Sequence, residues 1–346
     1  MSDERELLLD GAARMFADGV TAQLRARAEA GDWPTQLWQT LADAGLTVAS
    51  LPEALGGAGV PLADAFALNK LVGAYAAPLP LAEHLVAVRV LAEQGIALPL
   101  ATGAPVTFAL VAAGDDFAVR GGVAHGSVAG VPWGRAAVLA LVVAADGAAA
   151  VIAPQHATIE RGCNLAGEPR DVLRCAGIAA TQVDLGAWLP DVLLVHLALA
   201  RSAALAGALA TVLTLTLDYV QTRKQFGKPI SGFQAVQHQL AVLAGEVAAA
   251  QRATDAALDA VGTPAVTREV AAAKARVGEA AGVAAAIAQQ MHGAMGFTHE
   301  HHLHHFTRRL WAWRDEYGNE TYWQRRLGRE FAAAGADRAW PLFCAG

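Results

Sequence analysis

The sequence predicts a mainly α-helical protein with a small β domain in the middle of the chain. Hydrophobic residues make up 54% of the 346 residues, and much of this excess is alanine, the strongest helix former. Apolar residues recur at helical spacing before about residue 98 and again after about residue 189. Between these regions, short apolar runs alternate with Gly, Asp and Pro, which is typical of β-strands and turns. We therefore expect three domains, over residues 1–100, 101–190 and 191–346.

The first domain is predicted from helical periodicity. Apolar residues fall at helical spacing from Leu7 to Phe16 and from Trp38 to Gly45. The Gly56–Gly59 loop and the pair Pro78 and Pro80 interrupt these stretches, because Gly and Pro are the strongest breakers of regular structure. The amino-terminal domain should therefore consist of several helices rather than one.

The second domain is predicted to be a compact all-β domain. Its β-branched and apolar runs are short, and each is bounded by turn-forming residues. The predicted strands are Val106–Val111, Val138–Val143, Val151–Ala153 and Thr181–Leu185.

The third domain is predicted to be a bundle of long helices. Alanine-rich periodic stretches cover residues 191–222, 231–261 and 265–294, and a final one follows residue 318. The segment Gly262–Pro264 separates the second stretch from the third. The apolar faces of four such helices need more burial than a single bundle offers, so we expect the protein to assemble through this domain.

Composition excludes several classes of function. The net charge is −6 with no basic block, which argues against nucleic-acid binding. Charged residues interrupt the alanine runs before they approach the ~20 apolar residues of a membrane span. The amino terminus is charged and does not resemble a secretion signal. Three scattered cysteines form neither a disulfide framework nor a metal-ligand spacing. A reducing, cytoplasmic location is expected.

The segment that begins at Arg223 carries the most chemistry. Arg223 offers a planar charged fork suited to phosphate oxygens, and Phe226 offers a flat aromatic face. Gly227 allows close approach to the backbone, and Gln234 can both donate and accept hydrogen bonds. This set would suit the pyrophosphate and adenine end of a dinucleotide. The alternative is a corner between two helices in which Arg223 caps the first helix.

Three motifs, in order, resemble the acyl-CoA dehydrogenase family. The first is Leu41–Gly45 with the Pro-Glu-x-x-Gly-Gly-x-Gly run up to Gly59. The second is Arg-x-x-Phe-Gly-x-Pro-Ile from Arg223, followed by a Phe-Gln-x-x-Gln helix start. The third is Gln290–Glu300, which is similar to the family's Gln-x-x-Gly-Gly-x-Gly-Phe loop. The resemblance implies helical, β-barrel or β-sandwich, and four-helix-bundle domains, and FAD-dependent desaturation of an acyl-CoA thioester in lipid metabolism.

The catalytic base that the resemblance implies is out of register. In the family, a glutamate in a loop before the last helix usually removes the α-proton. Aligning that loop on Gly318 places Tyr317 at the glutamate position, and a tyrosine is a poor base at neutral pH. Glu316 is one position away and is the candidate catalytic residue if the loop is rearranged. The family's less common base position falls at Leu197, which has no basic group.

The resemblance also implies that half of the flavin site is degraded. The family's Thr-Glu-Pro-x-x-Gly-Ser-Asp stretch should follow the first strand, but Ala112–Phe117 is shorter and lacks its threonine, proline and serine. In the strand that normally covers the flavin ring, Gly130 replaces an aromatic residue and Pro132 replaces a hydroxyl. Trp133 lies three positions too late.

The other half of the flavin site is present. In the family, each FAD is shared at a subunit interface, where a neighbour's bundle holds the adenosine pyrophosphate. The residues that the resemblance assigns to that role are Arg223, Gln225, Phe226, Gln234, Gln290, Gly293 and Ala294. The chain thereby resembles the shorter, flavin-site-degenerate subunits of heteromeric acyl-CoA dehydrogenases, which act on bulky substrates such as steroid side chains.

The leading hypothesis is therefore a subunit that completes the FAD site of a paralogous acyl-CoA dehydrogenase. The implied partners are the acyl-CoA substrate, that paralogue and an electron-transferring flavoprotein, in a homo- or hetero-oligomer such as a tetramer. One alternative is an active homotetramer that uses Glu316. The other is a non-catalytic scaffold or acyl-CoA-binding relic without flavin.

Five histidines between His299 and His305 also suggest a metal site, because His301 and His305 have helical i, i+4 spacing. Zinc sites need a third ligand and an oriented second shell. The family has a Gly-Phe-Thr-x-Glu-His pattern followed by a helix at this place, which explains a histidine without a metal. No metal is predicted.

Overall fold

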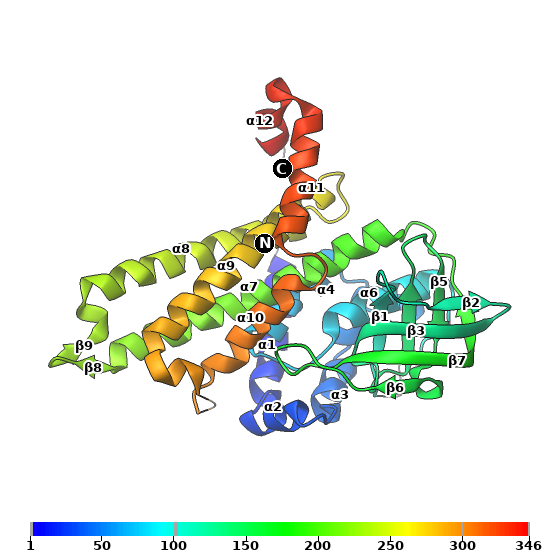
Figure 1. Ribbon diagram of the computed structural model, residues 1–346, viewed down its shortest axis with the longest axis horizontal. Helices are drawn as coiled ribbons and strands as arrows, with labels where there is room; N and C mark the ends of the chain where they lie inside the picture. Colours follow the sequence, from blue (N-terminus) through cyan, green and yellow to red (C-terminus); the bar gives the residue numbers. More distant parts are fainter. Residues whose placement is uncertain (1–2, 100–102, 299, 345–346) are drawn as a thin grey trace. The chain divides into compact units, whose positions relative to one another are not determined.

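The computed structural model describes residues 3–99, 103–298 and 300–344, which run in the order helices, strands, helices (Figure 1). The chain forms two compact units. The first, called the β unit, comprises Leu8–Ala65 and Ala77–Leu197. The second, called the bundle unit, comprises Met1–Leu7, Phe66–Ala76 and Ala198–Gly346. The division into three domains at residues 100 and 190 stays a prediction, although helices do give way to strands, and strands to helices, near those positions.

Short helices form the amino-terminal part of the chain. They are α1 (Asp3–Gly19), α2 (Ala22–Glu29), α3 (Thr35–Asp43), α4 (Leu62–Ala67), α5 (Asn69–Ala74) and α6 (Leu81–Glu93), with single 3-10 turns at Leu46–Val48 and Glu53–Leu55. The Thr21 hydroxyl caps α2 by accepting a hydrogen bond from the Leu24 N–H. Most of α6 is buried, and His84 on this helix accepts a hydrogen bond from the Val106 N–H at 3.0 Å. This bond links the helices of the β unit to its sheet.

The sheet contains seven strands. They are β1 (Val106–Leu110), β2 (Ala118–Arg120), β3 (Val123–Pro132), β4 (Leu139–Val143), β5 (Ala149–Ile152), β6 (Thr158–Glu160) and β7 (Arg170–Gln182), with a 3-10 turn at Pro154–His156. Their order is β1-β4-β5-β7-β3-β2, and β6 also pairs with β7. Among the strands that the structure describes, β1 and β4 are the pair that runs parallel. The core of the sheet includes Val128, Val131, Ile152 and Leu173.

The structure confirms three of the predicted strands and corrects the fourth. The runs at Val106, Val138 and Val151 form β1, β4 and β5. The predicted strand Thr181–Leu185 was wrong, because it is only the end of β7, which stops at Gln182. Along β7, the buried residues Asp171, Leu173 and Cys175 alternate with more exposed ones at first, and the pattern breaks near Gly177, which has φ +83°. That break hides a long strand from a search for continuous apolar runs.

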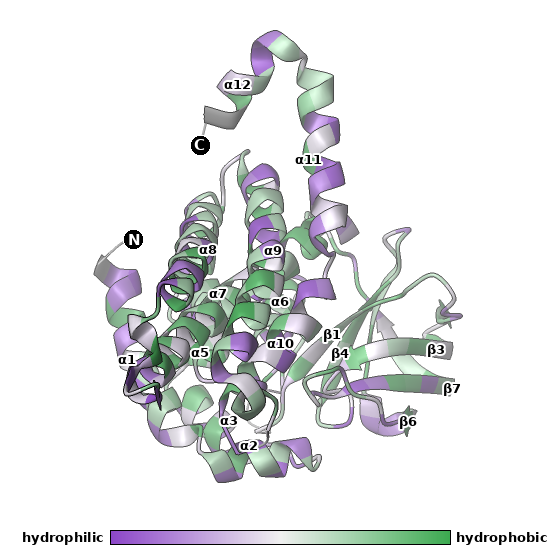
Figure 2. Cartoon of the chain, turned by 60° about the vertical axis from the view of Figure 1, so that its left-hand side comes forward, coloured by the Kyte–Doolittle hydropathy of each residue, from purple (hydrophilic) through white to green (hydrophobic). Residues whose placement is uncertain are grey.

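The bundle unit is built from long helices. They are α7 (Pro190–Thr222), α8 (Gln234–Asp259), α9 (Val266–His292), α10 (Leu303–Asp315), α11 (Glu320–Ala334) and α12 (Ala336–Cys344). The predictions for α7, α8 and α9 are confirmed within a few residues. The final stretch was predicted as one helix after residue 318, but it contains α11 and α12, and α10 precedes it. Most of α7 is hydrophobic, whereas α8 and α9 alternate hydrophobic and hydrophilic segments (Figure 2).

Small residues bring α5 and α7 into close contact. A Cβ atom added at Gly73 would lie 1.8 Å from the Ala204 carbonyl oxygen, and one at Gly207 would lie 1.9 Å from the Lys70 carbonyl oxygen. The Thr211 hydroxyl donates a hydrogen bond to the Ala74 carbonyl across the same contact at 2.8 Å. The abundance of alanine and glycine therefore lets these backbones approach more closely than larger side chains would allow.

By length and composition, α7 is the one helix in the described part of the chain that could cross a membrane. However, 83% of its most apolar 18-residue window is buried inside the protein. A core helix that is apolar on all sides has the same composition. The burial explains the hydrophobic character of α7 without a membrane.

Candidate functional site

The loop between α10 and α11 holds both candidates for the base position. It contains Glu316, Tyr317 and Gly318, and the Asn319 side chain caps α11 by accepting a hydrogen bond from the Tyr322 N–H at 3.0 Å. Tyr317 has φ +57°, in the left-handed region that disfavours residues with a side chain, and Gly318 has φ +90°. The loop therefore has a strained backbone at the residue that aligns with the family's glutamate.

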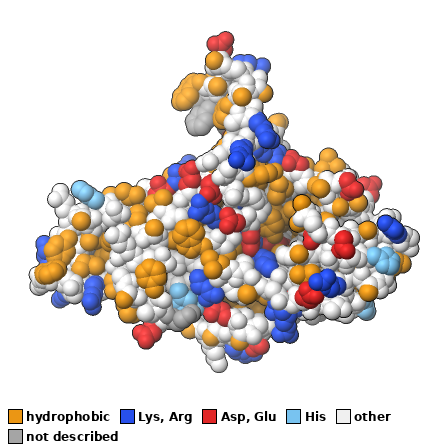
Figure 3. Space-filling model, in the orientation of Figure 1, with side chains coloured by type: hydrophobic (Ala, Val, Ile, Leu, Met, Phe, Trp, Pro, Cys, Tyr) orange, Lys and Arg blue, Asp and Glu red, His pale blue; other side chains and the backbone are white. Residues whose placement is uncertain are grey.

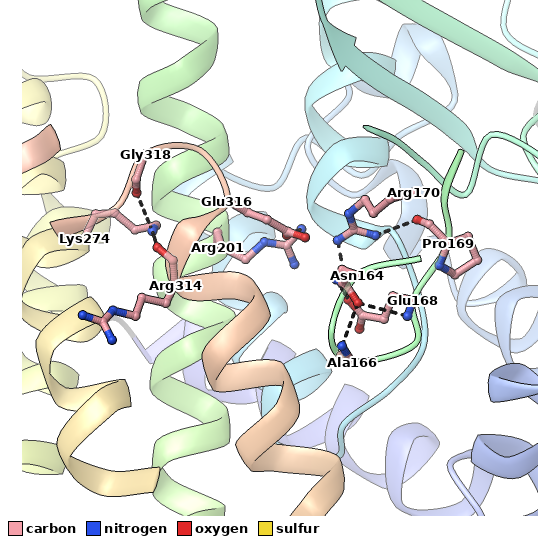
Figure 4. Close-up of polar contacts among 10 residues, drawn as sticks. All are labelled: Asn164, Ala166, Glu168, Pro169, Arg170, Arg201, Lys274, Arg314, Glu316 and Gly318. Atoms are coloured by element: carbon pink, nitrogen blue, oxygen red, sulfur yellow. Dashed lines mark hydrogen bonds and ion pairs between the residues drawn. The ribbon is translucent and has the colours of Figure 1, made fainter. Parts of the chain in front are cut away.

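Glu316 forms an ion pair with Arg201 of α7, at an N–O distance of 2.9 Å (Figure 4). Only 3% of the Arg201 side chain and 17% of the Glu316 side chain are exposed. The guanidinium of Arg201 also lies over the rings of Trp313 and Tyr317, 5.2 and 5.6 Å from their centroids. A neighbouring cation stabilises an ionised carboxylate and so weakens it as a base. This arrangement opposes the role of Glu316 as an acceptor of the substrate α-proton.

Sequence reasoning missed Arg201. The residue lies 115 positions before Glu316, so their contact could not be read from local spacing. One signal was available, because Arg201 is the one charged residue of α7 between Asp191 and Asp218. Charged residues are rarely buried unless they are paired. Leu197, the alternative base position, is buried and apolar, as its sequence indicated.

The Arg223 motif forms an exposed hairpin between α7 and α8. Its strands are β8 (Lys224–Gln225) and β9 (Lys228–Pro229), and a 3-10 turn at Ile230–Gly232 leads into α8. Phe226 and Gly227 make the tight turn, with φ +52° and +80°. Figure 3 shows hydrophobic and basic side chains gathered at this end of the bundle unit.

The predicted FAD contacts of this motif all face solvent. Arg223, Gln225, Phe226 and Gln234 are exposed, and 91% of Phe226 is accessible. The Phe226 ring meets Phe233 edge to face, with 6.1 Å between the ring centroids. The Arg223 backbone N–H donates to the Tyr219 carbonyl at 2.8 Å, but no group in the described residues accepts a hydrogen bond from its guanidinium. The side chain is therefore not engaged as a cap of α7, the alternative considered above.

The third motif, Gln290–Glu300, begins in the last turn of α9. Gln290, Gly293 and Ala294 are exposed, and Gly293 has φ +58° and ψ −137°. A Cβ atom at the buried Gly296 would lie 3.0 Å from the Gln289 carbonyl oxygen. The glycines of this motif are thus required by the shape of the turn. The role of these residues in binding FAD stays a prediction.

Aromatic contacts bring the two motifs to the same end of the bundle unit. Tyr219, near the end of α7, stacks on His292, the last residue of α9, with 4.3 Å between ring centroids. His301 meets the His292 ring edge to face at 4.6 Å. Burial lowers the pKa of His292, and its Nδ1 lies 2.8 Å from the Ala288 carbonyl. A neutral His292 ring therefore joins the ends of α7 and α9.

His301 and His305 do not have the helical i, i+4 geometry that suggested a metal. His301 precedes α10, so it does not share a helical face with His305. Nδ1 of His301 accepts a hydrogen bond from the Leu303 N–H at 3.2 Å, and this nitrogen is therefore occupied. His299 lies outside the described residues.

In the β unit, the loop that should hold the flavin ring folds back on β3. The Asp116 carboxylate accepts hydrogen bonds from the Ser127 N–H at 2.6 Å and from the Ser127 hydroxyl at 2.8 Å. These bonds lower the pKa of Asp116. A Cβ atom at Gly126 would lie 2.2 Å from the Asp116 carbonyl oxygen, so only glycine permits this approach.

Trp133 does not replace the missing aromatic cover. It follows the end of β3, has φ +48° and is only 3% exposed. The guanidinium of Arg170 lies 5.0 Å from its ring centroid. The Trp133 ring is therefore part of the interior of the β unit. Gly130, at the expected aromatic position, has φ +67° and is exposed.

Comparisons with known proteins agree with these features. Residues 2–97 match the acyl-CoA dehydrogenase amino-terminal domain, and residues 192–327 match the acyl-CoA dehydrogenase carboxyl-terminal domain. Acyl-CoA dehydrogenase IpdE2 of Mycobacterium tuberculosis is 31% identical over 317 residues, which cover 89% of this chain and 91% of the relative. The chain belongs to the acyl-CoA dehydrogenase family. This family consists of flavin-dependent oxidoreductases, and its architecture is the one observed here.

Solved structures of other family members have the same fold. The Tcur3481-Tcur3483 steroid ACAD, as a G363A variant, has a TM-score of 0.86 at 28% identity, covering 96% of this chain and 98% of that one. The ChsE4-ChsE5 complex from Mycobacterium tuberculosis has a TM-score of 0.86 at 24% identity, covering 97% and 99%. At that identity, the second structure shows a shared fold alone.

Proposed function

We propose that this chain is a subunit of a heteromeric, FAD-dependent acyl-CoA dehydrogenase that completes its partner's FAD site and leaves proton abstraction to the partner. One observation carries this proposal. Glu316 is the only acidic residue adjacent to the aligned base position that could replace the family's glutamate, and it is held in an ion pair with the buried Arg201. Tyr317 at the aligned position has no basic group of suitable strength.

The residues of this chain fit only one part of FAD. The exposed Arg223 fork and the Phe226 face suit the pyrophosphate and adenine of a flavin held mainly by another chain. The β unit does not fit the flavin ring, because its loop is bonded to Ser127 and its nearby tryptophan is buried. We therefore infer that FAD is shared at a subunit interface and is bound weakly, if at all, by this chain alone.

The chemistry of the family assigns distinct roles to the two subunits. Bound FAD supplies an acceptor for the β-hydride of the acyl thioester. In this chain, Arg223 and Phe226 bind and orient the adenosine end, and Gln290, Gly293 and Ala294 shape the adjoining turn. Arg201 keeps the Glu316 carboxylate in its ion pair, where it does not accept the substrate α-proton.

Substrate and partners follow from the relatives. The solved structure at 28% identity is a steroid ACAD with two components, Tcur3481 and Tcur3483, which supports a bulky acyl-CoA substrate and a paralogous partner. We further propose assembly as a tetramer, transfer of electrons to an electron-transferring flavoprotein, a role in lipid metabolism and a cytoplasmic location. The three-domain organisation at residues 100 and 190 belongs to the same proposal.

Flavin content tests this proposal directly. The chain is purified alone, and again after co-expression with a full-length acyl-CoA dehydrogenase paralogue, and flavin absorbance per protein is measured in both. We expect stoichiometric FAD only in the co-purified complex. Stoichiometric FAD in the chain alone would contradict the proposal and favour a homotetramer that uses Glu316. Absence of FAD from a stable complex would contradict it in favour of a relic without flavin.

A further inference from the structure

A fully buried lysine of the bundle unit lies against the loop between α10 and α11, Glu316–Asn319, which we call the base loop. Lys274 of α9 has 0% exposure, and its ammonium group donates hydrogen bonds to two backbone carbonyls. One belongs to Arg314, in the last turn of α10, and the other to Gly318, just before α11. Both distances are 2.7 Å, which is typical of charge-assisted bonds. A single nitrogen atom therefore joins the two ends of the loop (Figure 4).

Other contacts hold the same loop between these two points. The Trp323 indole N–H donates to the Tyr317 carbonyl at 3.0 Å. The Arg314 Nε lies 3.0 and 3.1 Å from the two carboxylate oxygens of Glu320, so the last turn of α10 is bonded to the first turn of α11. Strained backbone persists only when surrounding contacts over-determine it, and Tyr317 at φ +57° meets this condition.

We infer that Lys274 is a positioning residue, which fixes the Arg314–Gly318 backbone so that the Glu316 side chain faces Arg201. One observation and one physical argument support this role over simple filling of space. The Lys274 nitrogen bonds to main-chain oxygens on both sides of Glu316 rather than to a carboxylate. An apolar side chain of similar length would fill the volume without the cost of burying an amine, but it could not hold either carbonyl.

The charges around Lys274 come from every element packed against the loop. Arg201 faces it from α7, Asp315 from the end of α10, Glu316 from the loop and Glu320 from α11. Burial, assisted by Arg201, lowers the pKa of Lys274 to about 7, and the three carboxylates oppose this shift. Both the charged and the neutral amine can donate two hydrogen bonds, so Lys274 can hold both carbonyls on either side of neutral pH.

This inference rests on the proposed function only for its consequence, which is that Glu316 stays unavailable as a base. The positioning itself is tested on the full chain alone, without a partner or FAD. Hydrogen–deuterium exchange of peptides that cover residues 314–323 is compared in the unmodified chain, Lys274→Met and Lys274→Arg. The control is Lys70→Met, which removes a lysine that pairs with Asp255 elsewhere in the bundle unit.

We expect Lys274→Met to raise exchange in residues 314–323 at least tenfold, while peptides from α8 keep their protection. Lys70→Met should leave residues 314–323 unchanged, and Lys274→Arg, which retains donors, should restore part of the protection. Unchanged exchange in Lys274→Met, or an equal rise throughout the bundle unit, would overturn the inference.

Carboxyl labelling supplies a second readout of the same loop. A water-soluble carbodiimide with an amine nucleophile should modify Glu316 at least several times faster in Lys274→Met than in the unmodified chain. If Lys274→Met does not fold, Lys274→Gln replaces it, because glutamine is neutral and too short to reach both carbonyls. Equal labelling of Glu316 in the unmodified chain and in the folded variant would contradict the inference. A failure of co-expression to yield FAD would contradict only the proposed function.

Discussion

Arg201 and Glu316, on a helix and a loop that are 115 residues apart in sequence, form a largely buried ion pair 2.9 Å long. The Arg201 guanidinium also lies over the ring faces of Trp313 and Tyr317. The acidic residue nearest the family's base position is thereby committed to a structural partner. This relationship separates the chain from family members in which a glutamate of this loop removes the α-proton.

Arg223 should control the affinity of the assembled enzyme for FAD. Arg223→Ala should leave the chain folded, because the side chain is exposed and its guanidinium forms no hydrogen bond within the described residues. A charge-assisted, bidentate contact contributes roughly 1.5–3 kcal/mol, so FAD affinity in the co-purified complex should fall about ten- to a hundredfold. Arg223→Lys should recover only part of this loss. Titration of each FAD-stripped complex with FAD measures the change in affinity.

The control for Arg223→Ala is Arg325→Ala. It also removes an exposed arginine, but from α11, outside the Arg223 motif. It should change neither FAD affinity nor melting temperature. If Arg223→Ala lowers the melting temperature and leaves FAD affinity unchanged, Arg223 instead stabilises the carboxyl end of α7 as a cap.

The close contact of α5 with α7 should make the stability of the chain sensitive to any side chain at position 207. In Gly207→Ala the new Cβ would lie 1.9 Å from the Lys70 carbonyl, and a backbone atom cannot rotate away. We expect a loss of about 3 kcal/mol in the free energy of unfolding, at the upper end of overpacking costs. Gly245→Ala on α8, where nothing lies within 4 Å, should instead stabilise the chain by about 0.5–1 kcal/mol. Urea unfolding of both variants checks the difference, and equal effects would refute the close packing.

The sequence predicted the fold better than it predicted the contacts at the base loop. Alanine-rich periodicity located α7, α8 and α9, because long helices repeat the same signal many times. It missed β3 and β7, whose glycines and exposed polar residues break the apolar runs. The Arg223 hairpin was recognisable because its residues are contiguous. The Arg201–Glu316 pair was not, because it depends on how α7 packs against a distant loop.

His84 should make the stability of the chain depend on pH in the acidic range. Burial lowers its pKa to about 4, whereas an unfolded histidine titrates near 6.5. Between these values the unfolded state binds more protons than the folded state, so stability is lost as the pH falls from about 6.5 to 4. The loss attributable to His84 should be about 3 kcal/mol. Urea unfolding from pH 7 to 4.5 measures it. Carboxylates also destabilise the fold in acid, so the same series on His84→Gln isolates the histidine, and identical pH dependence in both chains would contradict this assignment.

Lys274 should make the stability of the chain depend on pH in the alkaline range. Its folded-state pKa of about 7 lies below the unfolded value of ~10.4. Between these values the unfolded state again binds the extra proton, so the free energy of unfolding rises with pH, by at most about 1.4 kcal/mol per unit. Relative to Lys274→Met, the unmodified chain should therefore gain stability from pH 7 to 10 and show no relative change below pH 6. A constant difference across this range would show that Lys274 keeps an ordinary pKa.

If this chain does not supply the catalytic base, Glu316→Gln should leave the co-purified complex active. Glutamine keeps the shape of the side chain but cannot accept the α-proton, whereas general-base catalysis typically contributes 10²–10⁴-fold to the rate. The measurement is kcat for acyl-CoA desaturation per bound FAD, with the melting temperature recorded to confirm that the complex is folded. We expect kcat to change by less than about threefold, because the base belongs to the partner. A fall of about a hundredfold or more in a folded, FAD-loaded complex would contradict it and identify Glu316 as the base.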